Sequence, residues 1–362
     1  MHLDHKFKRL FLHVGLGKTG TTTIQKDLLA KAELLESRYG LHYPRGFSHA
    51  KRHEGNHSIL LRALFSDAPE IQDRLVAMGL ATPQTVDKFN DKTLAQLKRG
   101  FESTTASDLL ISAEGVGHFR RPQMDDLAAW LSEISETIVV VACVRHPLQA
   151  LSSEIQQRLC IGEVLETMYE NPPGYLFRHL FKRLEDSFGR ENVIAYSFAD
   201  AVHEECGLTA MLLRQLGVAA EADFPKSSAR NLSMSHEGAL LLSACNRQRP
   251  ILVDGARNPE RLGVNFNYFR NLPGRPYRAP AEVYSAVAAA AVKDVQWVER
   301  EYSINLGSFD EHAEEDYRAF SQESIEFIAD VLADRSRSKY PLLGSIIRVL
   351  AKPYLRLRKM LR

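Results

Sequence analysis

The sequence predicts an α/β fold, a three-layer sandwich with a mostly parallel central sheet. Short runs of apolar and β-branched residues alternate with stretches of helical periodicity, which is the order of a parallel sheet covered by helices. One run, TIVVVACV at residues 137–144, shows no polar alternation, as expected for a strand covered on both faces. A Gly- and Thr-rich turn with one Lys follows the first run, as in loops that hold phosphate groups.

The expected elements follow one another along the chain. The first strand is LFLHVG (10–15), and the turn after it leads into a helix on which Ile24, Leu28 and Leu35 share one face. The later strands are expected in LHYP (41–44), DLLISAEG (108–115), TIVVVACV (137–144) and NVIAYSF (192–198). Residues 46–107 are expected to form a helical insertion. Beyond about residue 235 we expect mainly helices and no strand.

One elaborated domain of residues 1–334 is the expected organisation. A chain of 362 residues is long enough for two domains, but it contains no internal repeat and no long linker. Its 44% hydrophobic and 25% charged residues are ordinary values for a soluble globular protein.

A cytoplasmic location is expected from cysteine usage and from the N-terminus. Cys143, Cys160, Cys206 and Cys245 lie far apart and match no metal or redox spacing, which favours a reducing compartment. The short apolar run near the N-terminus leads directly into the Gly/Thr-rich turn, so cleavage of a signal peptide would destroy that turn. The sequence contains no run of about 20 apolar residues, so no membrane span is predicted.

Residues 335–362 form a basic amphipathic tail. They hold nine of the 46 Lys and Arg residues and no acid, so the rest of the chain carries a net charge of about −8. Apolar residues such as Leu343, Ile347 and Leu350 share one helical face, with Arg348 and Lys352 opposite. Such a segment suits an anionic membrane surface, which would make the protein peripheral on the cytoplasmic face. The alternative is a terminal helix docked on the body of the protein.

The turn GLGKTGTTT (15–23) is a candidate anion-binding loop. It is not a Walker A motif, because that motif places its Lys after the second glycine, whereas Lys18 precedes Gly20. Small residues from Gly17 to Thr22 let backbone N–H groups approach an anion at the positive end of the following helix. Lys18 adds a charge, and further donors are the hydroxyls of Thr19, Thr21 and Thr22.

Two more candidates stand at expected strand ends, where ligands bind in parallel sheets. Arg145 closes one strand, Pro147 can open the next helix, and Ser153 lies on that helix, so Arg145 and Ser153 suit a phosphate monoester. The alternative for Arg145 is a structural ion pair. Glu114 ends another apolar strand, where a carboxylate is costly without a function or a partner. It is a candidate general base.

These residues together resemble the sulfotransferases that use 3′-phosphoadenosine-5′-phosphosulfate (PAPS). The loop Lys18-Thr19-Gly20-Thr21-Thr22 is similar to the loop that holds the 5′-phosphosulfate in that family, and Arg145 with Ser153 fits its 3′-phosphate element. The resemblance covers residues 10–235 and is strongest to bacterial relatives of the carbohydrate sulfotransferases. It extends to SSARNLSMSHEG (227–238), where Arg230 corresponds to a late cofactor-binding segment.

The resemblance implies transfer of the sulfuryl group of PAPS to an acceptor hydroxyl by in-line displacement, without a metal. Lys18 would stabilise the leaving phosphate oxygen, and a base would take the acceptor proton. Glu114 is the first choice for that base, followed by His57 and then His118. Alternatively, Glu114 only orients Lys18 or Arg120.

Two other functions stay open. A P-loop kinase or NTPase would share the loop, but it needs Mg²⁺ and normally an Asp at a strand end, where this chain has Arg145. A non-catalytic PAPS-binding protein would lack a base. The expected acceptor is a carbohydrate or a glycolipid, and no nucleic-acid partner is expected. Residues 250–280, which mix Arg with Asn, Tyr and Phe, form either an acceptor lid or a loop packed on the body.

Overall fold

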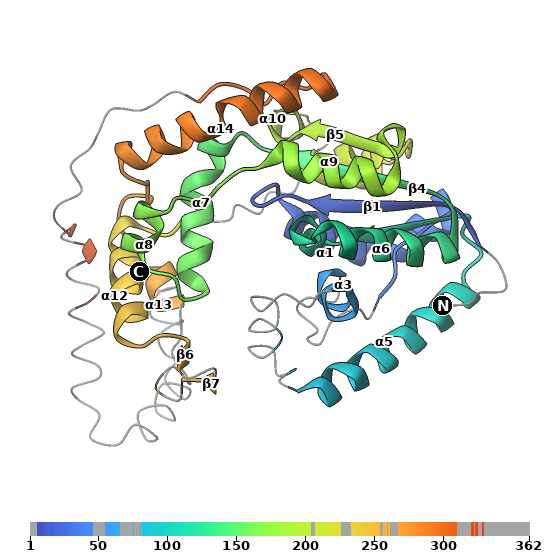
Figure 1. The fold of residues 1–362 in the computed structure, drawn as a ribbon, viewed down its shortest axis with the longest axis horizontal. Helices are drawn as coiled ribbons and strands as arrows, with labels where there is room; N and C mark the ends of the chain where they lie inside the picture. The colour runs from blue at the N-terminus through green and yellow to red at the C-terminus, as the bar shows by residue number, and fades with distance from the viewer. Residues whose placement is uncertain are drawn as a thin grey trace, which may run out of the picture.

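The computed structural model describes most of the chain (Figure 1). The described residues are 6–45, 55–65, 82–203, 207–225, 233–253, 256–258 and 267–309, with isolated pieces at 75, 80, 260, 320–321, 323–324 and 328. Arg230 and the whole tail of residues 335–362 lie outside them, so the expectations for both stay predictions.

Five parallel strands form the central sheet, in the order β2-β3-β1-β4-β5. They are β1 (Phe7–Gly15), β2 (Leu41–His42), β3 (Asp108–Ser112), β4 (Ser135–Val144) and β5 (Val193–Ser197). Because all five run in the same direction, their carboxyl ends meet at one edge of the sheet. The predicted parallel sheet is confirmed, with β1 at its centre.

Helices cover both faces of this sheet. Successive side chains of β1 point to opposite faces, so Leu10, Leu12 and Val14 enter one core while Phe11 enters the other. The helices of the first core are α3 (Ser58–Phe65), α5 (Pro83–Ser103), α6 (Arg121–Ile134), α9 (Phe177–Phe188) and the C-terminal end of α14 (Ala281–Tyr302). Those of the second are α1 (Thr21–Ala30), α2 (Ala32–Tyr39), α10 (Phe198–His203) and α11 (Gly207–Gln215). The predicted three-layer α/β sandwich is confirmed.

A third apolar core lies beside the sheet and is mainly helical. It joins α7 (Pro147–Cys160), α8 (Leu165–Glu170), α12 (His236–Gln248) and α14 (Ala281–Tyr302). Figure 1 shows α7, α8 and α12 gathered at one side of the sheet, together with the short helix α13 (Asn267–Arg270). Pro147 opens α7 as predicted, and the preceding His146 caps the helix by accepting the Leu148 N–H at 3.3 Å.

The described parts of the expected insertion (46–107) and of the C-terminal third are largely helical, as expected. The described part of residues 46–107 contains α3 and α5, and α5 begins at a capping box formed by Thr82 and Thr85. The expectation of no strand beyond residue 235 is wrong, because β6 (Leu252–Val253) and β7 (Ala256–Arg257) pair antiparallel. Among the described residues, no helix is both long and apolar enough to cross a membrane.

Candidate functional site

The loop between β1 and α1 has an unusual backbone. Lys18 has φ 66° and Gly20 has φ 77°, so both lie in the left-handed region. That region is open to glycine but costs a side-chain-bearing residue roughly 1 kcal/mol or more, and such residues cluster at functional sites. The loop starts where Gly15 packs on α1, since a β-carbon added at Gly15 would lie 2.2 Å from Thr21 Oγ1.

The N-terminus of α1 is left open by its own sequence. Gly20 is the N-cap, no side chain caps the helix, and its first turn contains no acid. The Thr23 and Ile24 N–H groups donate to the Gly20 carbonyl, so the amides before them precede the helical hydrogen bonds. Free amides and the helix dipole together favour an anion at this point.

The three threonines of the loop divide into two kinds. Thr19 donates from Oγ1 to the Leu16 carbonyl at 2.7 Å, and its hydroxyl lies 3.4 Å from that of Thr21. Both side chains are buried, so these hydroxyls hold the loop in shape. Thr22 is exposed on the first turn of α1. Of the three hydroxyls that the sequence offered for anion binding, that of Thr22 is the one left open to solvent.

Arg145 joins the end of β4 to this loop. Its Nη1 donates to the Lys18 carbonyl at 2.9 Å, and its guanidinium lies 4.6 Å from the centre of the Phe198 ring. Its Nε is buried without a hydrogen-bond partner among the described residues. Burial lowers the pKa of Arg145, although a guanidinium stays protonated in proteins. A fixed cation with an unused donor therefore faces the loop.

The sequence offered two other cofactor contacts, Ser153 and Arg230. Ser153 is half-buried on α7, two turns beyond Arg145, and no hydrogen bond joins these two side chains in the described structure. Arg230 lies outside the described residues. Their roles stay predictions.

Two carboxylates act electrostatically on Lys18. Burial lowers the pKa of Lys18, and Arg145 lowers it further, while Glu154, Glu114 and Cys160 raise it. Glu154 makes the largest of these opposing contributions. It was not a sequence candidate, although it directly follows Ser153 and stands four residues before Arg158, the spacing of a helical ion pair.

Glu114 stands at the carboxyl edge of the sheet, on the loop side. It begins the 3₁₀ helix η2 (Glu114–His118), two residues after Ser112 at the end of β3, and it is half-buried. Helix α3 fixes η2, because the Gly115 N–H donates to Ser58 Oγ at 3.0 Å and the Arg62 guanidinium packs on Gly115. Glu114 lies within electrostatic reach of Lys18, and its role as a base stays a prediction.

His57 has a different environment from the one expected of a base. It is fully buried, its Nε2 donates to the Pro44 carbonyl at 3.1 Å, and its Nδ1 accepts the Ser112 N–H at 2.9 Å. Burial lowers the pKa of His57 to about 3. Both ring nitrogens are used inside the core, which argues for a structural role and against proton transfer. The third candidate, His118, is exposed at the end of η2.

A second buried histidine was missed from the sequence. His13 on β1 lies beside Ser112 on β3, with Nδ1 and Oγ 2.9 Å apart in a hydrogen bond. Gln25 of α1 donates to the same Ser112 Oγ at 3.2 Å. Burial lowers the pKa of His13 to about 4. This neutral polar cluster ties α1 to β3 behind the loop.

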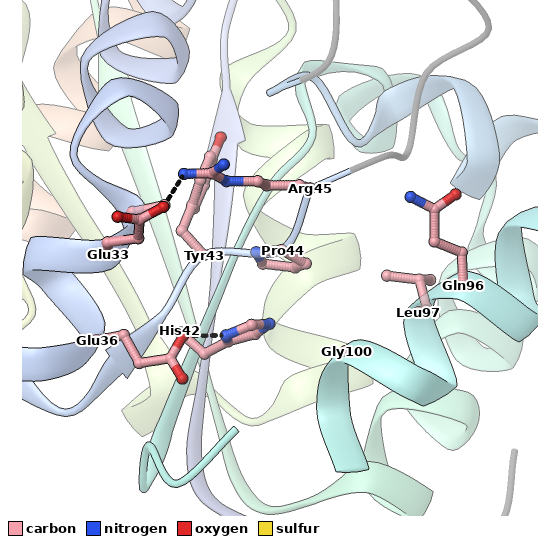
Figure 2. A pocket seen from close by; sticks show the side chains of 10 residues that line it. Glu33, Glu36, His42, Tyr43, Pro44, Arg45, Gln96, Leu97 and Gly100 are labelled. Atoms are coloured by element: carbon pink, nitrogen blue, oxygen red, sulfur yellow. Dashed lines mark hydrogen bonds and ion pairs between the residues drawn. The ribbon is translucent and has the colours of Figure 1, made fainter. Parts of the chain in front are cut away.

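One pocket lies at the edge strand β2, and no residue of the loop lines it. Its volume is about 240 Å³, and α2, β2 and α5 contribute the lining. Figure 2 shows two pairs across its wall, His42 with Glu36 at 2.8 Å and Arg45 with Glu33 at 3.4 Å. None of the sequence candidates lines it. The candidate site is therefore the loop and the strand ends beside it, and not this pocket.

Metal ligands were not expected, and the described residues contain no group of three His, Cys, Asp or Glu side chains that could hold a metal ion. The expectation that the reaction needs no metal stays a prediction.

Comparisons with known proteins gave no sequence match and only weak structural similarity. No protein-family model matches the chain, and no curated protein sequence matches it. Its fold is similar to a sulfotransferase domain from the Synechococcus PCC 7002 olefin synthase, with 15% identity, a TM-score of 0.32, and 80% of this chain and 98% of that domain covered. A sulfotransferase domain from the curacin biosynthetic pathway is similar at 10% identity and a TM-score of 0.32, over 79% of this chain and 98% of that domain.

Proposed function

We propose that this chain is a sulfotransferase that moves the sulfuryl group of PAPS to an acceptor hydroxyl. The observation that carries the proposal is the hydrogen bond from Arg145 to the Lys18 carbonyl. It sets a half-buried guanidinium from one strand end against the candidate anion-binding loop at the neighbouring strand end. A ligand with two anionic groups, such as a nucleoside 3′,5′-bisphosphate, matches two such cationic positions.

The residues present fit such a donor. The uncapped start of α1 and the loop amides would hold the 5′-phosphosulfate, with Gly17 to Thr22 lining it. Arg145, whose Nε has no partner among the described residues, would hold the 3′-phosphate with Ser153 and Arg230. When bound, the donor supplies an activated sulfuryl group with a phosphate as its leaving group.

Two side chains carry the chemistry in this proposal. Lys18 places a positive charge where negative charge develops on the leaving oxygen, in a mostly buried setting where charge interactions are stronger than in water. Glu114 takes the proton of the acceptor hydroxyl as the new bond forms. His57 has no part in proton transfer, because both of its nitrogens are bonded inside the core.

The acceptor in this proposal is a carbohydrate or a glycolipid. Of the suggested lid at residues 250–280, the described part contains β6, β7 and α13. Arg270 on α13 lies within electrostatic reach of Cys160 on α7, which in turn lies within reach of Lys18. Attachment of the tail to an anionic membrane and a cytoplasmic location belong to the same proposal.

The same residues fit the two alternative functions less well. A P-loop kinase or NTPase would place its Lys after the second glycine and an Asp at a strand end, whereas Lys18 precedes Gly20 and β4 is followed by Arg145. A non-catalytic PAPS-binding protein would have no use for a base, whereas Glu114 is held within electrostatic reach of Lys18.

The proposal is tested by transfer from ³⁵S-labelled PAPS to a panel of oligosaccharides and glycolipids. We expect labelled product with the wild type and a loss of at least about 100-fold in rate with Lys18→Ala. Lys98→Ala is the matched control, since Lys98 is an exposed lysine paired with Glu102 on α5, and it keeps the wild-type rate. Equal rates for wild type and Lys18→Ala would overturn the proposed role of the loop.

A further inference from the structure

Arg145 and Phe198 follow two neighbouring parallel strands at the same level of the sheet. Val144, the last residue of β4, lies beside Ser197, the last residue of β5. The next residue along each segment is therefore Arg145 on one and Phe198 on the other, at the carboxyl edge where parallel sheets bind ligands. The guanidinium carbon of Arg145 lies over the Phe198 ring, 4.6 Å from its centre, which is the range of a cation–π contact.

Arg145 differs from the other arginines that lie over aromatic rings in the described part of the chain. Each of those arginines also pairs with a carboxylate: Arg9 over Phe11 with Asp108, Arg38 over Tyr39 with Asp223, and Arg190 over Tyr302 with Glu185. Among the described residues Arg145 has no carboxylate partner, and its hydrogen bond goes to the Lys18 carbonyl instead. The Phe198 ring stands where the other arginines have an acid.

An aromatic face suits a cation whose charge is needed by a ligand. A carboxylate bonded to the guanidinium would compete with a phosphate for the same N–H donors. A ring over the face of the guanidinium stabilises the charge and leaves the donors at its edge unused. The ring also restricts the rotation of a long side chain before any ligand arrives.

We propose that Phe198 is a positioning residue, which holds the Arg145 guanidinium against its ring so that the charge stays available to an anionic ligand at the loop. This rests on the proposed function, in which the ligand is the nucleoside bisphosphate part of the sulfuryl donor. Phe198 acts through Arg145. The bond from Arg145 Nη1 to the Lys18 carbonyl fixes the guanidinium from the loop side, and the ring fixes it from the side of β5.

The test uses Phe198→Leu, which keeps an apolar side chain and removes the aromatic face. We expect calorimetric binding of adenosine 3′,5′-bisphosphate to weaken by about five- to tenfold. Phe198→Tyr keeps the ring, so its affinity should stay within about twofold of the wild type. Phe198→Met replaces the leucine variant if that variant does not fold. Wild-type affinity in the variants without a ring would overturn the proposal, and so would a tyrosine variant as weak as they are.

A double-mutant cycle separates positioning of Arg145 from a general structural role. In the Arg145→Ala background, Phe198→Leu should weaken bisphosphate binding by less than about twofold more, because both changes remove the same contact. An equal loss in both backgrounds would show that Phe198 acts on the fold and not through Arg145.

Phe224→Leu is the matched control. The Phe224 ring also lies 4.6 Å from a cation, the ammonium group of Lys31, and Phe224 belongs to the core on which Phe198 packs. We expect Phe224→Leu to keep the wild-type affinity for the bisphosphate. A loss equal to that in Phe198→Leu would overturn the specific role of Phe198.

A ligand-free measurement separates this proposal from the proposed function. The Arg145 Nε is buried, so its N–H should exchange slowly with water and give an NMR signal, assigned with Arg145→Lys. The ring current of Phe198 should shift this signal in the wild type and in Phe198→Tyr, and the shift should be lost in Phe198→Leu. A wild type that binds no bisphosphate would refute the proposed function and the role of Phe198 in binding. An Nε–H signal that does not move in Phe198→Leu would refute the contact itself.

Discussion

Arg145 donates a hydrogen bond from Nη1 to the backbone carbonyl of Lys18 over 2.9 Å, across 127 residues of sequence. Lys18 is held there in a left-handed conformation that side-chain-bearing residues rarely adopt. The bond fixes the direction of the Lys18 carbonyl and so the shape of the loop. It also brings the two cationic groups of the candidate site together at the carboxyl edge of the sheet.

The strained backbone at Lys18 predicts that a glycine at this position stabilises the fold, although activity is lost. Replacing Lys18 by glycine removes the left-handed strain, whereas Lys18→Ala keeps it, and both variants lose the ammonium group. We expect Lys18→Gly to be more stable than Lys18→Ala by about 1 kcal/mol in urea denaturation, with sulfuryl transfer lost in both. A less stable glycine variant would contradict the left-handed conformation of this residue.

Gly15 is predicted to be essential for the packing of the loop on α1. An added β-carbon would lie 2.2 Å from Thr21 Oγ1, in a buried place between β1 and α1. We expect Gly15→Ala to lower the free energy of unfolding by about 2 kcal/mol through overpacking. Gly174→Ala is the control, since nothing lies within 4 Å of an added carbon there, and its denaturation midpoint should match that of the wild type.

The two buried histidines predict a loss of stability in mild acid. Burial lowers the pKa of His57 to about 3 and that of His13 to about 4. In the unfolded chain a histidine titrates at about 6.5, so below that pH the unfolded state binds more protons and is favoured. Stability therefore falls as pH drops from about 6.5 towards 4, by up to about 1.4 kcal/mol per pH unit for each histidine.

Urea denaturation at several pH values between 7.5 and 4.5 measures this slope. His57→Gln should be less stable than the wild type at pH 7.5, because it loses two buried hydrogen bonds, and should show roughly half the pH slope. A free energy of unfolding that stays constant over this range would contradict the neutral, buried state of both side chains.

Glu114 is predicted to act on turnover and not on donor binding. Glu114→Gln keeps the size of the side chain but cannot accept a proton, so kcat should fall by about 100-fold or more. The affinity for adenosine 3′,5′-bisphosphate should change by less than about threefold, or become tighter, since a negative charge near Lys18 is removed. Unchanged kcat would show that Glu114 only orients its cationic neighbours.

The sequence was informative where the signal is local. The strands, the turn after β1 and the Arg145–Pro147 junction are each encoded within a few adjacent residues, so their structural predictions are borne out. The four-residue pairing of β6 with β7 was missed because two-residue strands carry no periodic pattern.

Residues whose environment depends on distant segments were not predictable in this way. His57 lies in a polar stretch, HEGNHS, that indicates a surface loop, yet Pro44 and Ser112 enclose it from other parts of the chain. Glu154 lies against Gly17 only because α7 returns to the loop from 137 residues further along the chain. Nothing in the local pattern of either residue specifies that neighbour.

Calorimetric binding of adenosine 3′,5′-bisphosphate, compared with ATP and Mg²⁺, tests the central claim most directly when wild type and Arg145→Ala are measured side by side. The account predicts that the wild type prefers the bisphosphate and that Arg145→Ala weakens its binding by about 1.5–3 kcal/mol. A preference for ATP with Mg²⁺, or a bisphosphate affinity that does not depend on Arg145, would contradict it.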